Sequence, residues 1–195
     1  MHGEQSCEFI LGAQKASQFP FTYYPEFAFI GASNVGKSSL INALTKQKIA
    51  ITSNTPGRTR QLNFFLLSKK IMIVDMPGYG FAKAGAGQIA QWQKTSFEYF
   101  ASRAQLKRVF LLLDPVKGLK KSDQEMANIF NSTGVNFQVI FTKADKLKRE
   151  ELAAAKAKVC EQIKSWPALH PEVIVTSSKN EEGLEAIKLE MVGYL

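Results

Sequence analysis

Eight residues in the first quarter of the chain combine glycines with a lysine and a serine in a pattern that binds phosphate groups. They read Gly31-Ala32-Ser33-Asn34-Val35-Gly36-Lys37-Ser38 and satisfy G-x-x-x-x-G-K-[ST]. Glycines let backbone N–H groups wrap around phosphate oxygens, Lys37 can reach the terminal phosphates, and the Ser38 hydroxyl suits Mg²⁺. The apolar run Phe27–Ile30 precedes the loop and helical spacing follows it, so a helix N-terminus adds its positive field. The sequence therefore predicts a nucleotide phosphate site with Mg²⁺.

A second motif supplies a carboxylate and a glycine after another apolar run. Asp75-Met76-Pro77-Gly78 follows the run Ile71–Val74, which places Asp75 at the carboxyl end of a predicted strand. There the carboxylate can hold the Mg²⁺ shell through water, and the Gly78 N–H can reach the terminal phosphate. We predict that Lys37 and Gly78 act on the transferred phosphate together with Thr59.

A third motif indicates which base is bound. Thr142-Lys143-Ala144-Asp145 follows a strand-like run that ends at Phe141. A carboxylate can accept hydrogen bonds from both N1–H and the exocyclic amine of guanine, whereas adenine has no donor at N1. Lys143 would lie along the purine and ribose. The alternative is a solvated charge run in which Asp145 decorates a helix N-terminus.

Two loops complete the predicted site. Thr176-Ser177-Ser178 follows the last predicted strand and would present backbone N–H groups to guanine O6. The segment 55–60, Thr55-Pro56-Gly57-Arg58-Thr59-Arg60, lies between the first helix and a hairpin. A threonine hydroxyl there would complete the Mg²⁺ shell while the γ-phosphate is present and release it after hydrolysis. Thr59 is preferred and Thr55 competes with it.

The elements that must position these loops alternate between strands and helices. Strand-length apolar runs at 27–30, 64–67, 71–74, 109–113, 137–141 and 173–175 are interleaved with helical spacing at 37 onward, 88–102, 122–131, 149–165 and 182–192. This order predicts an α/β fold with a mostly parallel sheet covered by helices on both faces. Combined with the phosphate-loop, Asp-x-x-Gly and base motifs above, it predicts the three-layer P-loop GTPase (Ras-like) architecture. Ser68-Lys69-Lys70 separates two runs, so one antiparallel edge strand is expected. Residues 1–24 have no clear period and are interpreted as an N-terminal extension packed on a domain of residues 25–195.

Composition narrows the class of protein. The 195 residues are 45% hydrophobic and 22% charged, which excludes collagen-like and disordered chains. The net charge of +8 favours a polyanionic partner. Cys7 and Cys160 lie in no metal-binding pattern and are expected to be free thiols in a cytoplasmic protein. No apolar run reaches the length of a membrane span.

These motifs together resemble the EngB (YihA/YsxC-type) GTPases of the TrmE–Era–EngA–EngB–septin group. The similarity extends over nearly the whole chain and is carried by residues 25–30, the phosphate loop with 39–42, 55–59, 63–65, 75–82 and 142–147. It implies a GTP- and GDP-binding protein with Mg²⁺ held by Ser38, Thr59 and Asp75, and adds Ser39, Gly57 and Arg58 to the nucleotide-binding residues. It also implies a role in assembly of the large ribosomal subunit and in normal cell division and septation. Ala32 and Arg60 replace residues common in that family, so contacts of those side chains are not transferred.

The residues around the reaction centre predict slow hydrolysis. In Ras-like enzymes a glutamine directly after Asp-x-x-Gly orients the attacking water, but Tyr79 stands here. A phenol lacks the donor and acceptor pair of an amide, so stimulation by a partner or a cation is expected. Asn34 resembles an asparagine that coordinates K⁺ in some relatives, and its alternative role is to tolerate an unusual backbone conformation. Arg58 and Arg60 either supply positive charge to the reaction or contact RNA.

The partner implied by charge and resemblance is the large ribosomal subunit, through its RNA and proteins. Basic groups at 69–70, 103–108, 117–121 and 146–149 are candidate contacts, and no DNA, membrane or second copy is expected. Three alternatives stay open. The first is a nucleoside-phosphate kinase, in which Asp145 would have no clear role. The second is a trafficking GTPase, which would carry a lipidation cysteine. The third is an RNA-binding module, which would need neither Lys37 nor Asp75.

Overall fold

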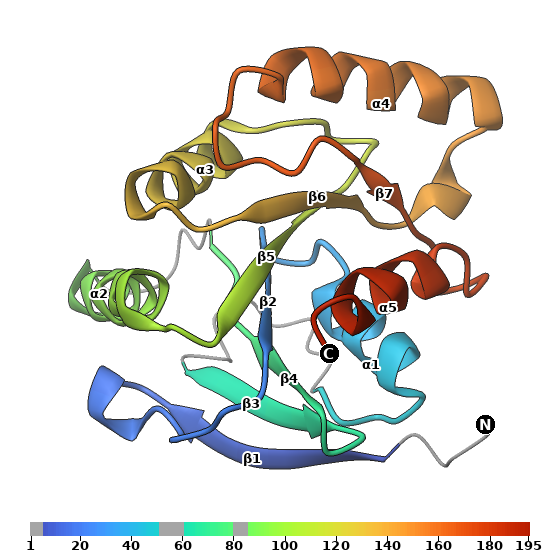
Figure 1. Cartoon of the computed structure of the whole chain (residues 1–195). Coiled ribbons are helices and arrows are strands. Elements are labelled where there is room, and N and C mark those ends of the chain that lie inside the picture. The colour runs from blue at the N-terminus through green and yellow to red at the C-terminus, as the bar shows by residue number, and fades with distance from the viewer. Residues whose placement is uncertain (1–5, 51–60, 80–85) are drawn as a thin grey trace.

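The computed structural model describes residues 6–50, 61–79 and 86–195. Its centre is a seven-stranded sheet with the strand order β1-β3-β4-β2-β5-β6-β7 (Figure 1). The strands are β1 (Cys7–Ala13), β2 (Glu26–Gly31), β3 (Leu62–Leu67), β4 (Ile71–Asp75), β5 (Leu106–Leu113), β6 (Phe137–Phe141) and β7 (Ile174–Val175). β4, β2, β5, β6 and β7 pair in parallel, so their carboxyl ends meet at one edge of the sheet.

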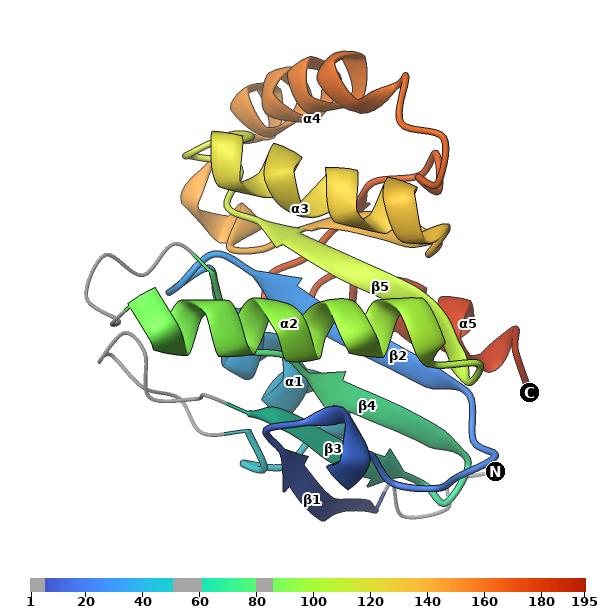
Figure 2. The same cartoon turned by 90° about the vertical axis from the view of Figure 1, so that its left-hand side faces the viewer.

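Helices cover both faces of the sheet, as the alternating pattern predicts. They are α1 (Lys37–Thr45), α2 (Ala86–Ser102), α3 (Lys121–Thr133), α4 (Arg149–Ile163) and α5 (Leu184–Val192), with short 3₁₀ turns η1 (Ala16–Gln18) and η2 (Ala144–Lys146). Figures 1 and 2 show α1 and α5 on one face and α2 and α3 on the other. No helix in the described ranges is both long enough and apolar enough to cross a membrane.

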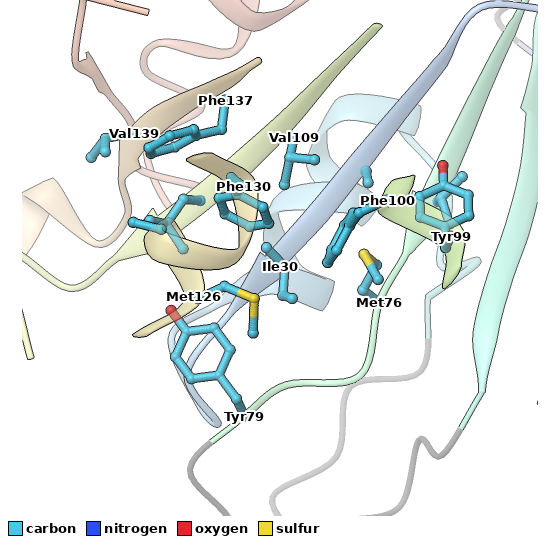
Figure 3. Packing of buried hydrophobic residues seen from close by; sticks show 14 of the residues in the cluster. Ile30, Met76, Tyr79, Tyr99, Phe100, Val109, Met126, Phe130, Phe137 and Val139 are labelled. Carbon is cyan, nitrogen blue, oxygen red and sulfur yellow. The ribbon is translucent and has the colours of Figure 1, made fainter. Parts of the chain in front are cut away.

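Alternate residues of the central strands feed two separate hydrophobic cores. In β2, Phe27 and Phe29 pack with α1 and α5, whereas Ala28 and Ile30 pack with α2, α3 and α4. Figure 3 shows the second core, where Ile30 lies among aromatic and methionine side chains. Since both faces of these strands are buried, they need apolar residues at every position, which explains the continuous apolar runs.

The hairpin expected from the Ser68–Lys70 turn is present. A further strand pairs with its outer side, and the sequence pattern does not predict it. β3 pairs antiparallel with β4, as predicted. The edge strand on this side of the sheet, however, is β1, which comes from the segment interpreted as an N-terminal extension and pairs antiparallel with β3. Cys7 and Ala13 are buried while Glu8, Phe9 and Ile10 between them are exposed. Without strict alternation β1 gives a weak strand signal, and its pairing rests on a partner far away in the chain.

Boundaries of several strands and helices differ from the sequence pattern by a few residues, and at the last helix the structure shows the cause. The spacing predicts a helix from residue 182, but α5 begins at Leu184. Ser177 and Glu182 exchange two backbone hydrogen bonds, at 3.1 and 3.0 Å, and Gly183 has a φ of 72° just before the helix. The loop 177–182, closed by these two hydrogen bonds, therefore moves the start of the helix to Leu184. The Thr176–Ser178 segment stays at the carboxyl edge of the sheet.

Candidate nucleotide-binding site

The phosphate loop lies between β2 and α1, as its motif predicts. Gly36 has a φ of 107°, in the left-handed region that favours glycine, and it immediately precedes the first turn of α1. The Thr142 hydroxyl donates a hydrogen bond of 2.6 Å to the carbonyl of Val35. The loop is thus fixed to the start of the base-binding motif, and the N-terminal amides of α1 form an anion-binding end.

Lys37 and Asp75 meet at this edge of the sheet. The Lys37 ammonium forms an ion pair with Asp75 Oδ1, and both side chains are largely buried. The register of β2 with β4 brings them together, because Phe29 lies opposite Asp75. An ammonium group and a carboxylate from the first two motifs therefore occupy one small region at the carboxyl edge of the parallel strands.

Gly78 lies directly against the phosphate loop. A Cβ built on Gly78 would be 3.2 Å from the carbonyl oxygen of Gly31 and 3.4 Å from the amide of Ser33. Backbone hydrogen bonds continue the contact: Tyr79 N–H donates to Gly31 O at 3.2 Å, and Ser33 N–H donates to Tyr79 O at 3.1 Å. Met76 and Pro77 lead into this contact from the end of β4, with Met76 N–H bonded to Phe29 O.

The side chain of Tyr79 turns away from the phosphate loop and into the protein. Its hydroxyl donates a 2.6 Å hydrogen bond to Asp123 Oδ1 in the first turn of α3. Figure 3 shows the ring beside Met126 of the same helix. Burial, followed by the negative charge of Asp123, raises the pKa of Tyr79 far above its ordinary range. The phenol is therefore a fixed donor to α3 and is not available to orient water at the phosphate loop.

The predicted base-binding residues also come together. Asp145 Oδ1 accepts a 2.7 Å hydrogen bond from the Ser177 hydroxyl, and the Ala144 N–H donates to Thr176 O at 3.1 Å. The hydrogen bond from Ser177 lowers the pKa of Asp145 below its ordinary value, since it favours the carboxylate. Ser178 follows on the same loop and is half-buried. An oriented carboxylate acceptor thus lies beside the Thr176–Ser178 loop.

Lys143 adds a link between the base and phosphate motifs. It has a left-handed backbone, with a φ of 54°, and its Nζ donates a 2.6 Å hydrogen bond to Asn34 O. The same ammonium pairs with Asp114 Oδ2 at 3.2 Å. Sequence reasoning missed Asp114, although it directly follows the apolar strand β5, at the sheet edge where the other site residues collect.

One part of the predicted site lies outside the described residues. This applies to the first-switch candidates Gly57, Arg58 and Thr59 and to their neighbours Thr55 and Arg60. Asn34, by contrast, is described: it has a φ of 61° and is exposed. The left-handed backbone agrees with the conformational role considered for Asn34 in the sequence.

The oxygen donors around Asp75 are of the kind that holds Mg²⁺ in proteins. Ser38 and Asp75 offer hard oxygen ligands, and the described residues contain no cluster of three or more His, Cys, Asp or Glu that would hold a metal alone. Mg²⁺ usually takes one or two protein oxygens and completes its shell with water and substrate phosphates. The residues present match that pattern.

Comparison with protein families and sequences shows which known proteins this chain is similar to. Residues 26–143 match the family described as 50S ribosome-binding GTPase. The Probable GTP-binding protein EngB of Gluconobacter oxydans (strain 621H) is 45% identical over 189 residues, covering 96% of this chain and 83% of the relative. The EngB protein of Rhodospirillum rubrum is 41% identical over 193 residues, covering 96% and 84%.

Solved structures share the fold. A crystal structure of a probable GTP-binding protein engB has a TM-score of 0.65 at 24% identity and covers 87% of this chain and all of that one. A point variant of Aquifex aeolicus Era bound to GDP·AlF4⁻ has a TM-score of 0.71 at 21% identity, covering 89% of this chain and 57% of that chain. The fold is therefore that of P-loop GTPases, and the sequence matches over most of its length show that this chain belongs to the EngB family of GTP-binding proteins.

Proposed function

We propose that this protein binds GTP and GDP, hydrolyses GTP slowly and acts as a nucleotide-dependent switch in assembly of the large ribosomal subunit. The observation that carries the proposal is the juxtaposition of two pairs: Asp145 held by Ser177, and Lys37 held by Asp75. Both lie at the carboxyl ends of the parallel strands of one sheet, with Lys143 connecting the base motif to the phosphate loop. Family membership supports the ribosomal partner.

In this proposal the chain holds the nucleotide at both ends. The amides of residues 33–38 and the Lys37 ammonium bind the phosphates, while Asp145 accepts from the N1–H and exocyclic amine of guanine. Ser38, Asp75 and Thr59 are proposed to hold Mg²⁺, which when bound neutralises charge that develops on the phosphates. For Lys37 to contact phosphate, its ion pair with Asp75 must loosen, which frees the carboxylate to face the metal shell.

Slow hydrolysis is proposed because the residue after Gly78 does not offer an amide to the attacking water. The Tyr79 hydroxyl donates a hydrogen bond to Asp123 instead. A ribosomal partner is proposed to supply the missing stimulation. Potassium is a second proposed stimulant, through Asn34 at the tip of the phosphate loop, and equal turnover in KCl and NaCl would contradict that part.

The cellular role is proposed from the family and from charge. A net charge of +8 suits ribosomal RNA, and the protein is proposed to act in the cytoplasm as a monomer. A role in cell division and septation is proposed as a consequence of ribosome shortage. Normal ribosome profiles in depleted cells that fail to septate would contradict that order of events.

The proposed switch is tested by sedimentation with purified large ribosomal subunits. The wild-type protein is loaded with GDP or a non-hydrolysable GTP analogue and pelleted at low and moderate salt. We expect association that depends on the GTP analogue and weakens steeply with salt, and expect Lys37→Ala to lose it. Equal pelleting of the GDP and GTP-analogue forms would contradict a nucleotide-dependent switch.

A further inference from the structure

Two aromatic rings stand exposed in the segment that connects η1 to β2. Phe21 and Tyr23 are each 84% exposed, more than any other large hydrophobic residue in the described ranges. Their ring centroids are 5.3 Å apart at an angle of 80°. Phe19, two residues earlier, points inward and packs on Phe64 and Tyr99. Exposed paired rings on a segment whose preceding aromatic is anchored in the core indicate a contact surface.

The backbone under these rings is held at both ends. Arg103 donates a 2.6 Å hydrogen bond to Pro20 O and is itself bound to the buried Glu26. At the other end, the Met72 N–H donates to Pro25 O at 2.9 Å. The rings are therefore presented on a fixed segment, so a partner that contacts them loses little ordering entropy.

The surroundings of the rings are positively charged. The bond from Met72 brings the β3–β4 turn beside Pro25, and Lys69 and Lys70 are exposed in that turn. Lys107 is exposed at the start of β5, next to the strand that the segment enters. Among the described residues none of these three lysines forms an ion pair. Glu26, which begins β2 at the end of this segment, is buried and bound by Arg103.

We propose that Phe21 and Tyr23, flanked by Lys69, Lys70 and Lys107, form a binding surface for single-stranded RNA. Exposed aromatic rings stack on unpaired bases, and lysine ammonium groups bind the phosphates between them. Double-stranded RNA offers no free base faces to such rings. A protein partner would favour a wider apolar patch, but Thr22, which separates the two rings in the chain, is polar.

This RNA surface lies at the opposite end of the sheet from the nucleotide site. β2, β4 and β5 begin there, at Glu26, Ile71 and Leu106, whereas the nucleotide motifs follow the carboxyl ends of strands (Figure 2). A strand of six residues spans about 20 Å. We therefore expect the RNA surface to bind equally in the GDP and GTP forms, as a constant anchor beside a nucleotide-dependent contact. Only the assignment of ribosomal RNA as the physiological source rests on the proposed function.

The test measures fluorescence anisotropy of a labelled, unstructured RNA of about 12 nucleotides titrated with the full chain in either nucleotide state. The wild-type protein should bind equally in both states. The double variant Phe21→Ala/Tyr23→Ala should lose about tenfold or more in affinity, since each stacked base contributes substantially. Tyr23→Phe should keep the wild-type affinity because it retains the ring. The exposed side chains allow both variants to fold, which an unchanged urea midpoint checks.

The lysines are tested by Lys69→Gln/Lys70→Gln/Lys107→Gln, with Lys121→Gln/Lys158→Gln/Lys164→Gln as a control of equal charge loss on α3 and α4. The first triple should weaken binding and flatten its salt dependence by about 2 in slope, since single strands release about 0.7 counterion per phosphate contacted. The control should change binding less. Unaltered RNA affinity in the ring variant, or equal affinity for a duplex of the same length, would overturn the proposal.

The experiments can contradict the RNA surface and the proposed switch independently of each other. If the ring variant binds the oligonucleotide as the wild type does, the surface is wrong even where GTP-dependent subunit association persists. If the wild type binds the oligonucleotide through the rings but shows no nucleotide-dependent subunit association, the surface stands and the switch is wrong.

Discussion

The hydroxyl of Tyr79 lies 2.6 Å from Asp123 Oδ1 and joins the residue after Gly78 to the first turn of α3. The other oxygen of Asp123 accepts the Lys120 N–H at 2.7 Å, so one carboxylate both caps α3 and holds Tyr79. The backbone of Tyr79 meanwhile pairs with Gly31 and Ser33 in the phosphate loop. Tyr79 therefore couples the phosphate loop to α3, and movement of the segment after Gly78 must stretch this connection.

Removing the Tyr79 hydroxyl should weaken the fold without removing nucleotide contacts. Tyr79→Phe leaves the buried Asp123 carboxylate without its side-chain donor, and hydrogen bonds to charged groups contribute about 1.5–3 kcal/mol. We expect a loss of that order in the free energy of urea unfolding. Tyr23→Phe is the control, since Tyr23 is exposed. Equal stability of the two variants would show that the Asp123 contact contributes little.

A methyl group at Gly78 should push the Asp-x-x-Gly segment away from the phosphate loop. The added Cβ would meet backbone atoms of Gly31 and Ser33, which cannot turn aside as a flexible side chain can. Because Gly78 is proposed to contact the γ-phosphate, Gly78→Ala should weaken binding of a GTP analogue several-fold more than binding of GDP. Gly87→Ala, where nothing lies within 4 Å, should bind both as the wild type does. Calorimetric titration of the two nucleotides measures the difference, and an equal loss for both would contradict the proposed contact.

The pKa of Asp145 should depend on Ser177. The folded-state pKa of Asp145 is lowered below its unfolded value, so its contribution to stability is present above the unfolded pKa and is lost as pH falls through the folded pKa. Ser177→Ala should raise the folded pKa toward the ordinary aspartate value, and Ser178→Ala should leave it lowered. Carboxyl chemical shifts followed by NMR from about pH 7 to about pH 2 report both values. An Asp145 pKa that does not respond to Ser177→Ala would assign the shift to another group.

The buried Glu26 should be among the residues that stability depends on most. It accepts hydrogen bonds from Arg103 and from the Tyr99 hydroxyl, at 2.9 Å each, and is fully buried. Breaking a buried pair by removing one partner costs about 3–5 kcal/mol, because the other charge is left uncompensated. We expect a loss of this order for Glu26→Ala in urea unfolding. Glu161→Ala, which breaks the exposed pair with Lys164, should cost less than about 1 kcal/mol.

The sequence predicts where the three motifs lie in the fold, because each motif is formed by neighbours in the chain. The phosphate loop, Asp75–Gly78 and Thr142–Asp145 each follow an apolar strand, and parallel strands bring their carboxyl ends together. Contacts between distant residues could not be predicted in this way. Lys143 with Asp114 and Tyr79 with Asp123 depend on the relative placement of strands and helices, and neither pair has a local motif.

The edge strand β1 shows the same limit in the fold. It pairs with β3, and its exposed Phe9 and Ile10 break the alternation that would identify a half-buried strand. The ring of Phe9 instead lies 5.6 Å from that of Phe65 in β3. Tertiary pairing therefore decides this element, because the local pattern alone does not.

The central claim is guanine recognition by Asp145, and it is tested most directly by nucleotide competition. Fluorescent GDP bound to the wild type is displaced with GTP, XTP or ATP, and the same competitors displace fluorescent XDP from Asp145→Asn. We predict that GTP displaces the probe from the wild type and excess ATP does not. Asp145→Asn should lose about a hundredfold or more in GTP affinity and gain affinity for XTP, since an amide pairs with the xanthine edge. Equal displacement by ATP from the wild type would contradict guanine recognition.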